Sequence, residues 1–230
     1  MLIINPVISA AISSNNRHRN DHYETPSWMA WCLELIVPIE GLILEPCCGE
    51  LAAIASYFRL KHTVITNDVD LNIRANHHLD LSIKENWNHL PEVHWVITNP
   101  PYKCNWQFLM GAYAKAKIGV AFLLRSTWLE DPKSEPERGQ WFWEHPMAAR
   151  ITMPRYAFRN AVKKDKWQTD ACAHVWAVWR KDDWRAEVQA PVIPRSVIPG
   201  FYENPEQKLM TSEMRCLNSV NSSTVIELAT

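Results

Sequence analysis

Long apolar runs are missing from this chain of 230 residues. No stretch approaches the roughly 20 consecutive apolar residues with which a helix crosses a bilayer. Residues 1–11 are apolar but lack the basic leading region and the cleavage site of a secretory signal. The six cysteines show no CxxC spacing, so neither a zinc site nor a disulfide framework is indicated. We therefore expect a cytoplasmic protein with no membrane span and no bound metal.

An excess of charge of either sign is also missing. The net charge is −1, which argues against a protein that coats nucleic acid with its whole surface. The charge is nevertheless uneven, because residues 1–102 hold 6 Lys/Arg and 11 Asp/Glu, whereas residues 150–185 hold 9 and 4. We therefore expect the later segment to face any polyanion that the protein binds.

Apolar and polar segments alternate in the order of a βαβ protein. Apolar runs without interruption suit the middle of a parallel sheet, because strands there are buried on both faces. The expected helices are 26–37, 51–60 and 106–116, and the expected strands are 42–44, 64–66, 78–80, 93–98, 118–124, 149–153 and 171–179. The expected fold class is α/β, a doubly wound and mostly parallel seven-stranded sheet that ends in an antiparallel hairpin.

The length suits one domain with extensions. A polar cluster precedes the first helix, and prolines are frequent after residue 185. We assign residues 1–21 to a flexible N-terminal arm, 22–185 to the domain, and 186–230 to a Pro-rich linker and C-terminal tail. Thr25 followed by Pro26 is typical of a helix N-cap with proline at the first helical position.

Residues at the carboxyl ends of the strands are the candidates for ligand binding, because ligands of doubly wound sheets bind there. The first strand ends in Glu45-Pro46-Cys47-Cys48-Gly49-Glu50, where the glycine permits a tight turn close to a ligand. Asp68 ends the second strand and could accept both hydroxyls of a ribose. Asp80 ends the third and could accept from an adenine amine. The alternatives are an ordinary strand exit, a turn residue and a helix N-cap, respectively.

The tetrapeptide Asn99-Pro100-Pro101-Tyr102 follows the fourth strand. Its two prolines fix their own backbone and bias Asn99 away from helix. The turn therefore presents the Asn99 amide oxygen and the Pro100 carbonyl as acceptors beside the Tyr102 ring, an arrangement that fits a flipped-out base with an exocyclic amine. The alternative is a surface turn of the kind that follows many strands.

Together these motifs resemble the class I S-adenosylmethionine-dependent methyltransferases that methylate the exocyclic amine of adenine in DNA, with features similar to the phage Dam-like members. Tyr23-Glu24-Thr25-Pro26 resembles their motif over the methionine end of the cofactor. The resemblance implies a Rossmann-like methyltransferase fold, S-adenosylmethionine as cofactor, and double-stranded DNA as partner, as in restriction–modification. It implies cofactor contacts at Tyr23, Thr25, Pro26, Glu45, Cys47, Gly49, Asp68 and Asp80, and catalytic roles for Asn99, Pro100, Pro101 and Tyr102.

Two features depart from the family pattern. Leu51 stands where a second glycine usually follows Gly49-Glu50, which predicts a looser hold on the cofactor. The C-terminal remainder is too short for a separate target-recognition domain, so we expect sequence specificity to come from loops or to be low. Two alternatives stay open: a methyltransferase that acts on RNA or on a protein glutamine amide, and a non-catalytic module that binds cofactor or nucleic acid without turnover.

The connection between the last two expected strands is basic and holds the candidate DNA contacts. If the sheet is built as expected, this connection projects beside the catalytic turn. The alternative is a solvated hairpin tip, with DNA bound by the arm at Arg17-His18-Arg19. The candidate contacts are Arg155, Arg159, Lys163, Lys164 and Lys166.

Overall fold

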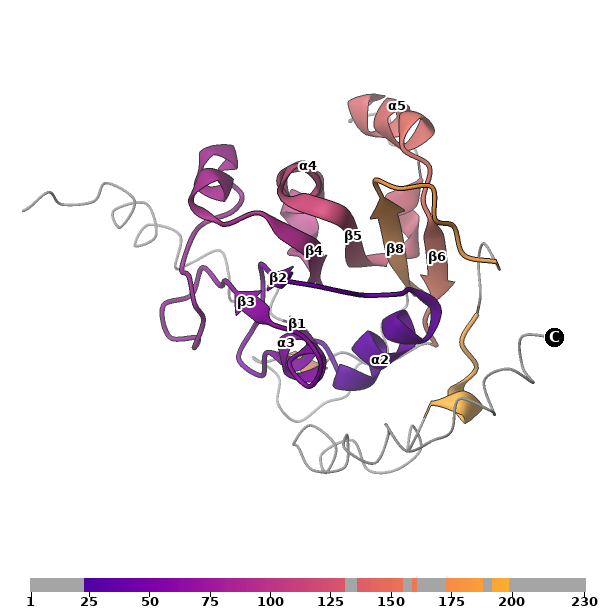
Figure 1. The fold of residues 1–230 in the computed structure, drawn as a ribbon, viewed down its shortest axis with the longest axis horizontal. Helices are drawn as coiled ribbons and strands as arrows, with labels where there is room; N and C mark the ends of the chain where they lie inside the picture. Colours follow the sequence, from indigo (N-terminus) through magenta and orange to yellow (C-terminus); the bar gives the residue numbers. More distant parts are fainter. Residues whose placement is uncertain (1–22, 131–135, 155–158, 161–172, 188–191, 199–230) are drawn as a thin grey trace, which may run out of the picture.

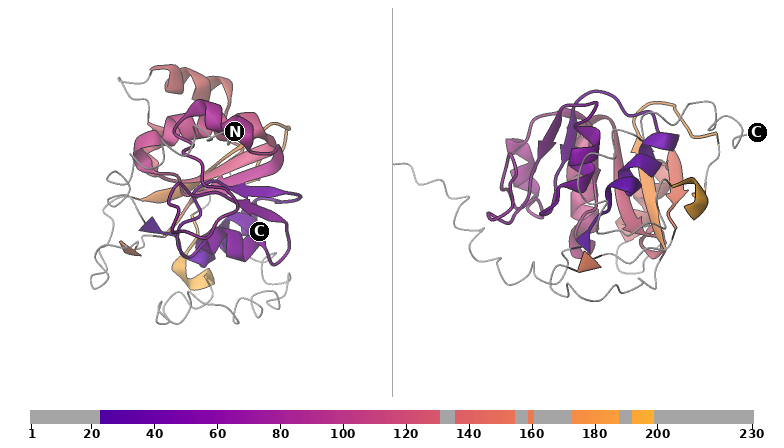
Figure 2. Two further views of the ribbon diagram at one scale, coloured as in Figure 1. Left: turned by 90° about the vertical axis from the view of Figure 1, so that its left-hand side faces the viewer. Right: turned by 90° about the horizontal axis from the view of Figure 1, so that it is seen from below.

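The computed structural model describes residues 23–130, 136–154, 159–160, 173–187 and 192–198. Its centre is a six-stranded sheet in the order β3-β2-β4-β5-β8-β6, with helices on both faces (Figure 1). The left panel of Figure 2 shows the sheet edge-on between the two helical layers. This is the α/β doubly wound fold that the alternation of segments predicts.

Four parallel strands form the first part of the sheet. Their central residues are almost all buried, which explains why they read as uninterrupted apolar runs. Register pairs such as Leu44 with Val96 and Val96 with Val120 align the strands side by side. The four strands are β2 (Ile43–Glu45), β3 (Val64–Thr66), β4 (Val93–Thr98) and β5 (Ala116–Arg125).

Two strands complete the sheet as the expected antiparallel hairpin. They are β6 (Ala149–Thr152) and β8 (His174–Arg180). The later strand β8 lies between β5 and β6 and runs antiparallel to both. Its start therefore lies at the same sheet edge as the end of β5, where Arg125 faces His174 across the ladder.

Helices cover the two faces separately (Figure 1). One face packs against α2 (Ser27–Ile36) and α3 (Ala53–Phe58), and Trp176 of the sheet donates its indole N–H to the Met29 carbonyl of α2 at 2.8 Å. On the other face, α4 approaches η2 so closely that a Cβ at Gly111 would collide with the Trp87 indole. The elements of this second layer are η2 (Lys84–His89), α4 (Asn105–Lys115) and α5 (Pro136–Glu144).

One of the seven expected strands, at 78–80, does not form, although the structure describes these residues. Asn67 takes the place of a partner strand, because its side chain bonds both backbone groups of Leu79. Its Nδ2 donates to the Leu79 carbonyl at 3.1 Å, and its Oδ1 accepts from the Leu79 N–H at 2.8 Å. An isolated bridge between Asn67 and His77 is the only ladder contact that is assigned within this segment. The Asn67 side-chain amide thus bonds the backbone groups of Leu79 that a neighbouring strand would otherwise bond.

Two short helices follow the turn of residues 99–102 and the end of β5. They are η3 (Tyr102–Cys104) and η4 (Ser126–Leu129). A second, two-stranded sheet joins β1 (Tyr23–Glu24) to β7 (Arg159–Asn160), which lies in the basic connection before β8. After the domain boundary predicted at 185, Ile193 and Ile198 still pack into the core beside α2, and η5 (Arg195–Val197) lies between them.

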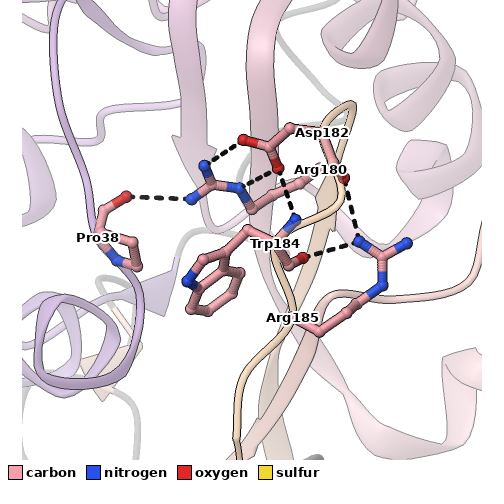
Figure 3. Close-up of polar contacts among 5 residues, drawn as sticks. All are labelled: Pro38, Arg180, Asp182, Trp184 and Arg185. Atoms are coloured by element: carbon pink, nitrogen blue, oxygen red, sulfur yellow. Dashed lines mark hydrogen bonds and ion pairs between the residues drawn. The ribbon is translucent and has the colours of Figure 1, made fainter.

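A network at the amino edge of the sheet joins the end of β8 to the segment after α2 (Figure 3). The Arg180 guanidinium forms a two-point ion pair with Asp182 and also donates to the Pro38 carbonyl at 3.3 Å. It lies over the rings of Trp95 and Trp184. The hydrogen bond from Arg180 holds the pKa of the Asp182 carboxyl below its ordinary value of 3.8. This network lies at the amino ends of the parallel strands, opposite the carboxyl ends that hold the candidate ligand-binding residues. We therefore assign it a structural role.

Within these ranges, no helix combines the length and the apolar character that crossing a membrane requires. The same residues contain no cluster of three or more His, Cys, Asp or Glu side chains arranged to hold a metal ion.

Candidate active site

The end of β4 presents Asn99 to Thr25, which lies 74 residues earlier in the chain. The Asn99 Nδ2 donates to the Thr25 Oγ1 at 3.0 Å, and Thr25 is buried while Asn99 is half-buried. The prediction that Thr25 caps the following helix is wrong: Pro26 occupies the N-cap position and no side chain caps the helix. Thr25 instead bonds the Asn99 amide, and in this arrangement the Asn99 Oδ1 is directed away from Thr25.

Tyr102 begins the short helix η3, and two side chains from the sheet hold its ring. The Arg125 guanidinium carbon lies 4.3 Å from the centre of the ring. The Tyr102 Oη lies 3.3 Å from the His174 Nε2, and His174 is buried. The sequence gives no local signal for either contact, because both side chains come from distant strands.

Glu45 at the end of β2 is buried and accepts a hydrogen bond from the Ala55 N–H of α3 at 2.7 Å. This bond ties the start of α3 to the end of the strand, with the loop of Cys47 and Gly49 held between them. The carboxylate also stabilises the positive end of the helix, where unpaired N–H groups gather. Glu45 therefore shapes the predicted cofactor loop, and its direct contact with a cofactor stays a prediction.

Asp68 after β3 completes the loop from the neighbouring strand. Its Oδ2 accepts from the Gly49 N–H at 2.9 Å, and its Oδ1 accepts from the Asp70 N–H at 3.0 Å. Asn67 adds a third tie, because its Nδ2 also donates to the Pro46 carbonyl at 2.9 Å. The ends of β2 and β3, 21 residues apart in the sequence, thus form one loop system at the carboxyl end of the sheet.

Asp80 lies in the extended segment that Asn67 holds, and its Oδ1 accepts from both the N–H and the hydroxyl of Ser82. The backbone carbonyl of Asp80 accepts from Asn86 Nδ2 at 2.8 Å. The carboxylate therefore has a fixed position beside the other strand ends even though no strand precedes it. Whether it contacts the adenine of a cofactor stays a prediction.

The backbone strain of the loop falls on Ala52. Gly49 adopts a φ of 66°, which glycine accepts freely, but Ala52 adopts φ 43° and ψ 43° immediately before α3. The left-handed region costs an L-residue about 1–2 kcal/mol. The sequence directs attention to Leu51 as the departure from the family pattern, whereas the structure places the unfavourable backbone one residue later.

The two thiols of this loop are not nucleophiles at neutral pH. Burial raises the pKa of the Cys48 thiol to about 12. Burial also raises the pKa of the Cys47 thiol, and the neighbouring Asp68 carboxylate raises it further. The thiolate is the reactive form of cysteine, and a raised pKa disfavours it.

The structure brings together most of the residues that the sequence assigns to the site. Thr25, Pro26 and the catalytic turn meet through the Thr25–Asn99 bond, and the loop of residues 45–49 meets Asp68. Of the candidate DNA contacts, Arg155, Lys163, Lys164 and Lys166 lie outside the described residues. The backbone of Arg159 pairs with Glu24, which places this part of the basic connection one residue from Thr25.

Comparisons with known proteins support the fold. No protein-family model and no curated protein matches the chain. The chain is similar in structure to a protein of Listeria monocytogenes assigned as a class I S-adenosylmethionine-dependent methyltransferase, with a TM-score of 0.55 and 13% identity over 88% of this chain and 77% of that chain. It is also similar to part of the protein in the DrdV–DNA complex, with a TM-score of 0.54 and 11% identity over 86% of this chain and 30% of that chain. The chain therefore has the Rossmann-like fold of S-adenosylmethionine-dependent methyltransferases.

Proposed function

We propose that this protein transfers the methyl group of S-adenosylmethionine to the exocyclic N6 amine of adenine in double-stranded DNA. The observation that carries the proposal is the hydrogen bond from Asn99 Nδ2 to Thr25. Since the amide donates on that side, its Oδ1 is directed elsewhere as an acceptor. An acceptor at the end of β4 is suited to a donor in the substrate, and an exocyclic amine is such a donor.

The hydrogen-bond acceptors at the neighbouring strand ends fit the hydroxyls and the amine of the cofactor. An ionised carboxylate offers about four acceptor positions, and Asp68 uses one on each oxygen for backbone N–H groups. Two positions remain for the two hydroxyls of a ribose. Asp80 uses its Oδ1 for Ser82, which leaves the Oδ2 to accept from an adenine amine.

In the proposed mechanism the protein mainly positions the substrate amine beside the cofactor and polarises that amine. S-adenosylmethionine, when bound, supplies a methyl group that its sulfonium has already activated. Asn99 Oδ1 and the Pro100 carbonyl accept hydrogen bonds from the amine and turn its lone pair toward the methyl carbon. The nitrogen bonds to that carbon as the carbon–sulfur bond breaks, and the extra proton passes to water. Tyr102 replaces the stacking that the base loses on leaving the duplex.

The β1–β7 ladder supports a nucleic acid as the substrate over a protein glutamine amide. The ladder ties the basic connection at Arg159 to Glu24, next to Thr25. The backbone of Arg159, a candidate DNA contact, therefore pairs one residue from Thr25, and the proposal assigns the phosphate backbone to this basic connection. The match to part of the protein in the DrdV–DNA complex is consistent with this assignment.

A transfer assay with tritiated cofactor tests the proposal on double-stranded DNA, RNA and a glutamine-containing peptide in parallel. We expect incorporation into DNA only, and nucleoside mass spectrometry should show N6-methyladenine. Asn99→Ala should abolish transfer while calorimetry shows cofactor affinity within a few-fold of wild type. Asn88→Ala, on the exposed surface of η2, is the matched control and should retain full activity.

Each other outcome has a definite meaning. Incorporation into RNA or peptide alone would replace DNA as the substrate and leave methyl transfer in place. Cofactor binding without transfer to any of the three would identify a non-catalytic module. Methylation at a cytosine ring carbon would overturn the mechanism, because that chemistry needs a thiolate nucleophile.

A further inference from the structure

We propose that Arg125 and His174 are positioning residues that hold the Tyr102 ring so that only one of its faces receives the substrate. This inference rests on the proposed function above. The Arg125 guanidinium carbon lies 4.3 Å from the centre of the ring, over one face. The His174 Nε2 lies 3.3 Å from the Tyr102 Oη, at the edge of the ring.

Both contacts come from one rigid position in the sheet. Arg125 is the last residue of β5 and His174 is the first residue of β8. The two residues lie directly opposite each other in the β5–β8 ladder. Tyr102 itself belongs to a three-residue turn that no side chain caps, so the turn alone does not fix the ring.

The two contacts restrict different motions of the ring. A group against the face blocks rotation about χ1, which would carry the ring sideways. A partner at the hydroxyl restricts the tilt of the ring and holds its far end. Together they leave Tyr102 one well-populated rotamer, which lowers the entropy cost of stacking a base.

The position of Arg125 also decides which face is available. With a guanidinium on one face, a planar base can stack only on the opposite face of Tyr102. The cation offsets part of the negative potential of the ring. The face that remains is thereby suited to a neutral, electron-rich purine and less suited to a cationic ligand. Arg125 therefore contributes to substrate selection through Tyr102 without touching the substrate itself.

A spectroscopic measurement tests the positioning without any substrate. Protein labelled with 3-fluorotyrosine gives one ¹⁹F signal for each of its six tyrosines, and Tyr102→Phe identifies the signal of Tyr102. We expect Arg125→Met and His174→Gln each to shift and broaden this signal and to leave the others in place. Arg150→Met, on the neighbouring strand β6, is the matched control and should leave the Tyr102 signal unchanged.

Kinetics provide the second measurement. Stacking of a base on an aromatic side chain is the interaction at stake, so we expect the KM for DNA to rise about 3- to 10-fold in Arg125→Met and His174→Gln. The kcat should change less than 3-fold, and cofactor affinity should be unchanged. Arg125→Lys keeps the charge and should recover most of the loss in KM.

The two measurements fail in different ways. An unchanged Tyr102 signal in both variants overturns the positioning role, whatever the activity of the protein. If the two variants shift the Tyr102 signal but the wild-type protein methylates no DNA, the positioning of Tyr102 is supported and the proposed function is refuted. A fall in kcat with an unchanged KM also overturns the inference, because it would assign Arg125 to the chemical step.

Discussion

Thr25→Val removes the acceptor of the Asn99 amide while keeping the shape of the side chain. The bond it breaks is buried on the Thr25 side and 3.0 Å long. A hydrogen bond of this kind contributes about 0.5–1.5 kcal/mol net. If the bond selects one amide orientation over the half-turn alternative, a loss of about 1.4 kcal/mol lowers the ratio of the productive to the reversed orientation about tenfold, and the rate falls by up to this factor when the reversed orientation then predominates. We therefore expect kcat to fall about 3- to 10-fold.

The assay is steady-state methyl transfer to DNA, combined with calorimetry for the cofactor. Thr25→Ser retains the hydroxyl and should stay within about 2-fold of wild type. In the Asn99→Ala background, which is inactive in transfer, Thr25→Val should leave cofactor affinity unchanged by calorimetry, because its effect is exerted through Asn99. An unchanged kcat with weaker cofactor binding would refute the reasoning and assign Thr25 to the cofactor, as the family resemblance implies.

Three further predictions follow from the loop and from the edge network. Asp68→Ala should weaken cofactor binding tenfold or more by calorimetry, and an unchanged dissociation constant would move the cofactor site elsewhere. Ala52→Gly should raise the free energy of unfolding by about 0.5–1 kcal/mol, since glycine accepts a positive φ, whereas Ser56→Gly inside the helix should lower it in the same denaturant titrations. Asp182 has a lowered pKa when folded, so its ion pair with Arg180 stabilises the protein above pH 4 and is lost as the pH falls below 3.8. Because Asp182 is half-exposed, Asp182→Asn should cost only about 0.5 kcal/mol at pH 7 and nothing near pH 2; a cost that is the same at both pH values would contradict this.

The periodicity of the sequence predicts the central strands well, because burial on both faces leaves uninterrupted apolar runs. The runs at 93–98 and 118–124 lie within β4 (Val93–Thr98) and β5 (Ala116–Arg125). The expected strand at 78–80 fails for a physical reason. Its backbone is satisfied by the side chain of Asn67, and a sequence pattern does not reveal a partner of this kind.

The residues of the candidate site also divide into those that the sequence reveals and those that it does not. The turn at Asn99 and the carboxylate of Asp68 are recognisable because each stands at the end of an apolar run. Their partners are not, because the Thr25–Asn99 and His174–Tyr102 contacts join residues 74 and 72 positions apart. Local rules instead assign Thr25 to the nearest helix, where threonine is a common cap, although it bonds Asn99. Prediction from one sequence thus names the candidate groups and misses the side chains that contact them.

The position of β8 between β5 and β6 has a consequence for biosynthesis. The ribosome delivers β6 first, and the 21 residues at 153–173 must follow before β8 can enter the gap. At roughly 5–20 residues per second this interval lasts about 1–4 s. During it, β5 and β6 each present a bare edge to other chains. The first residue of the arriving strand is His174, so the event that closes the sheet also delivers the partner of Tyr102. One late strand therefore both covers these two edges and completes the contacts of the candidate active site.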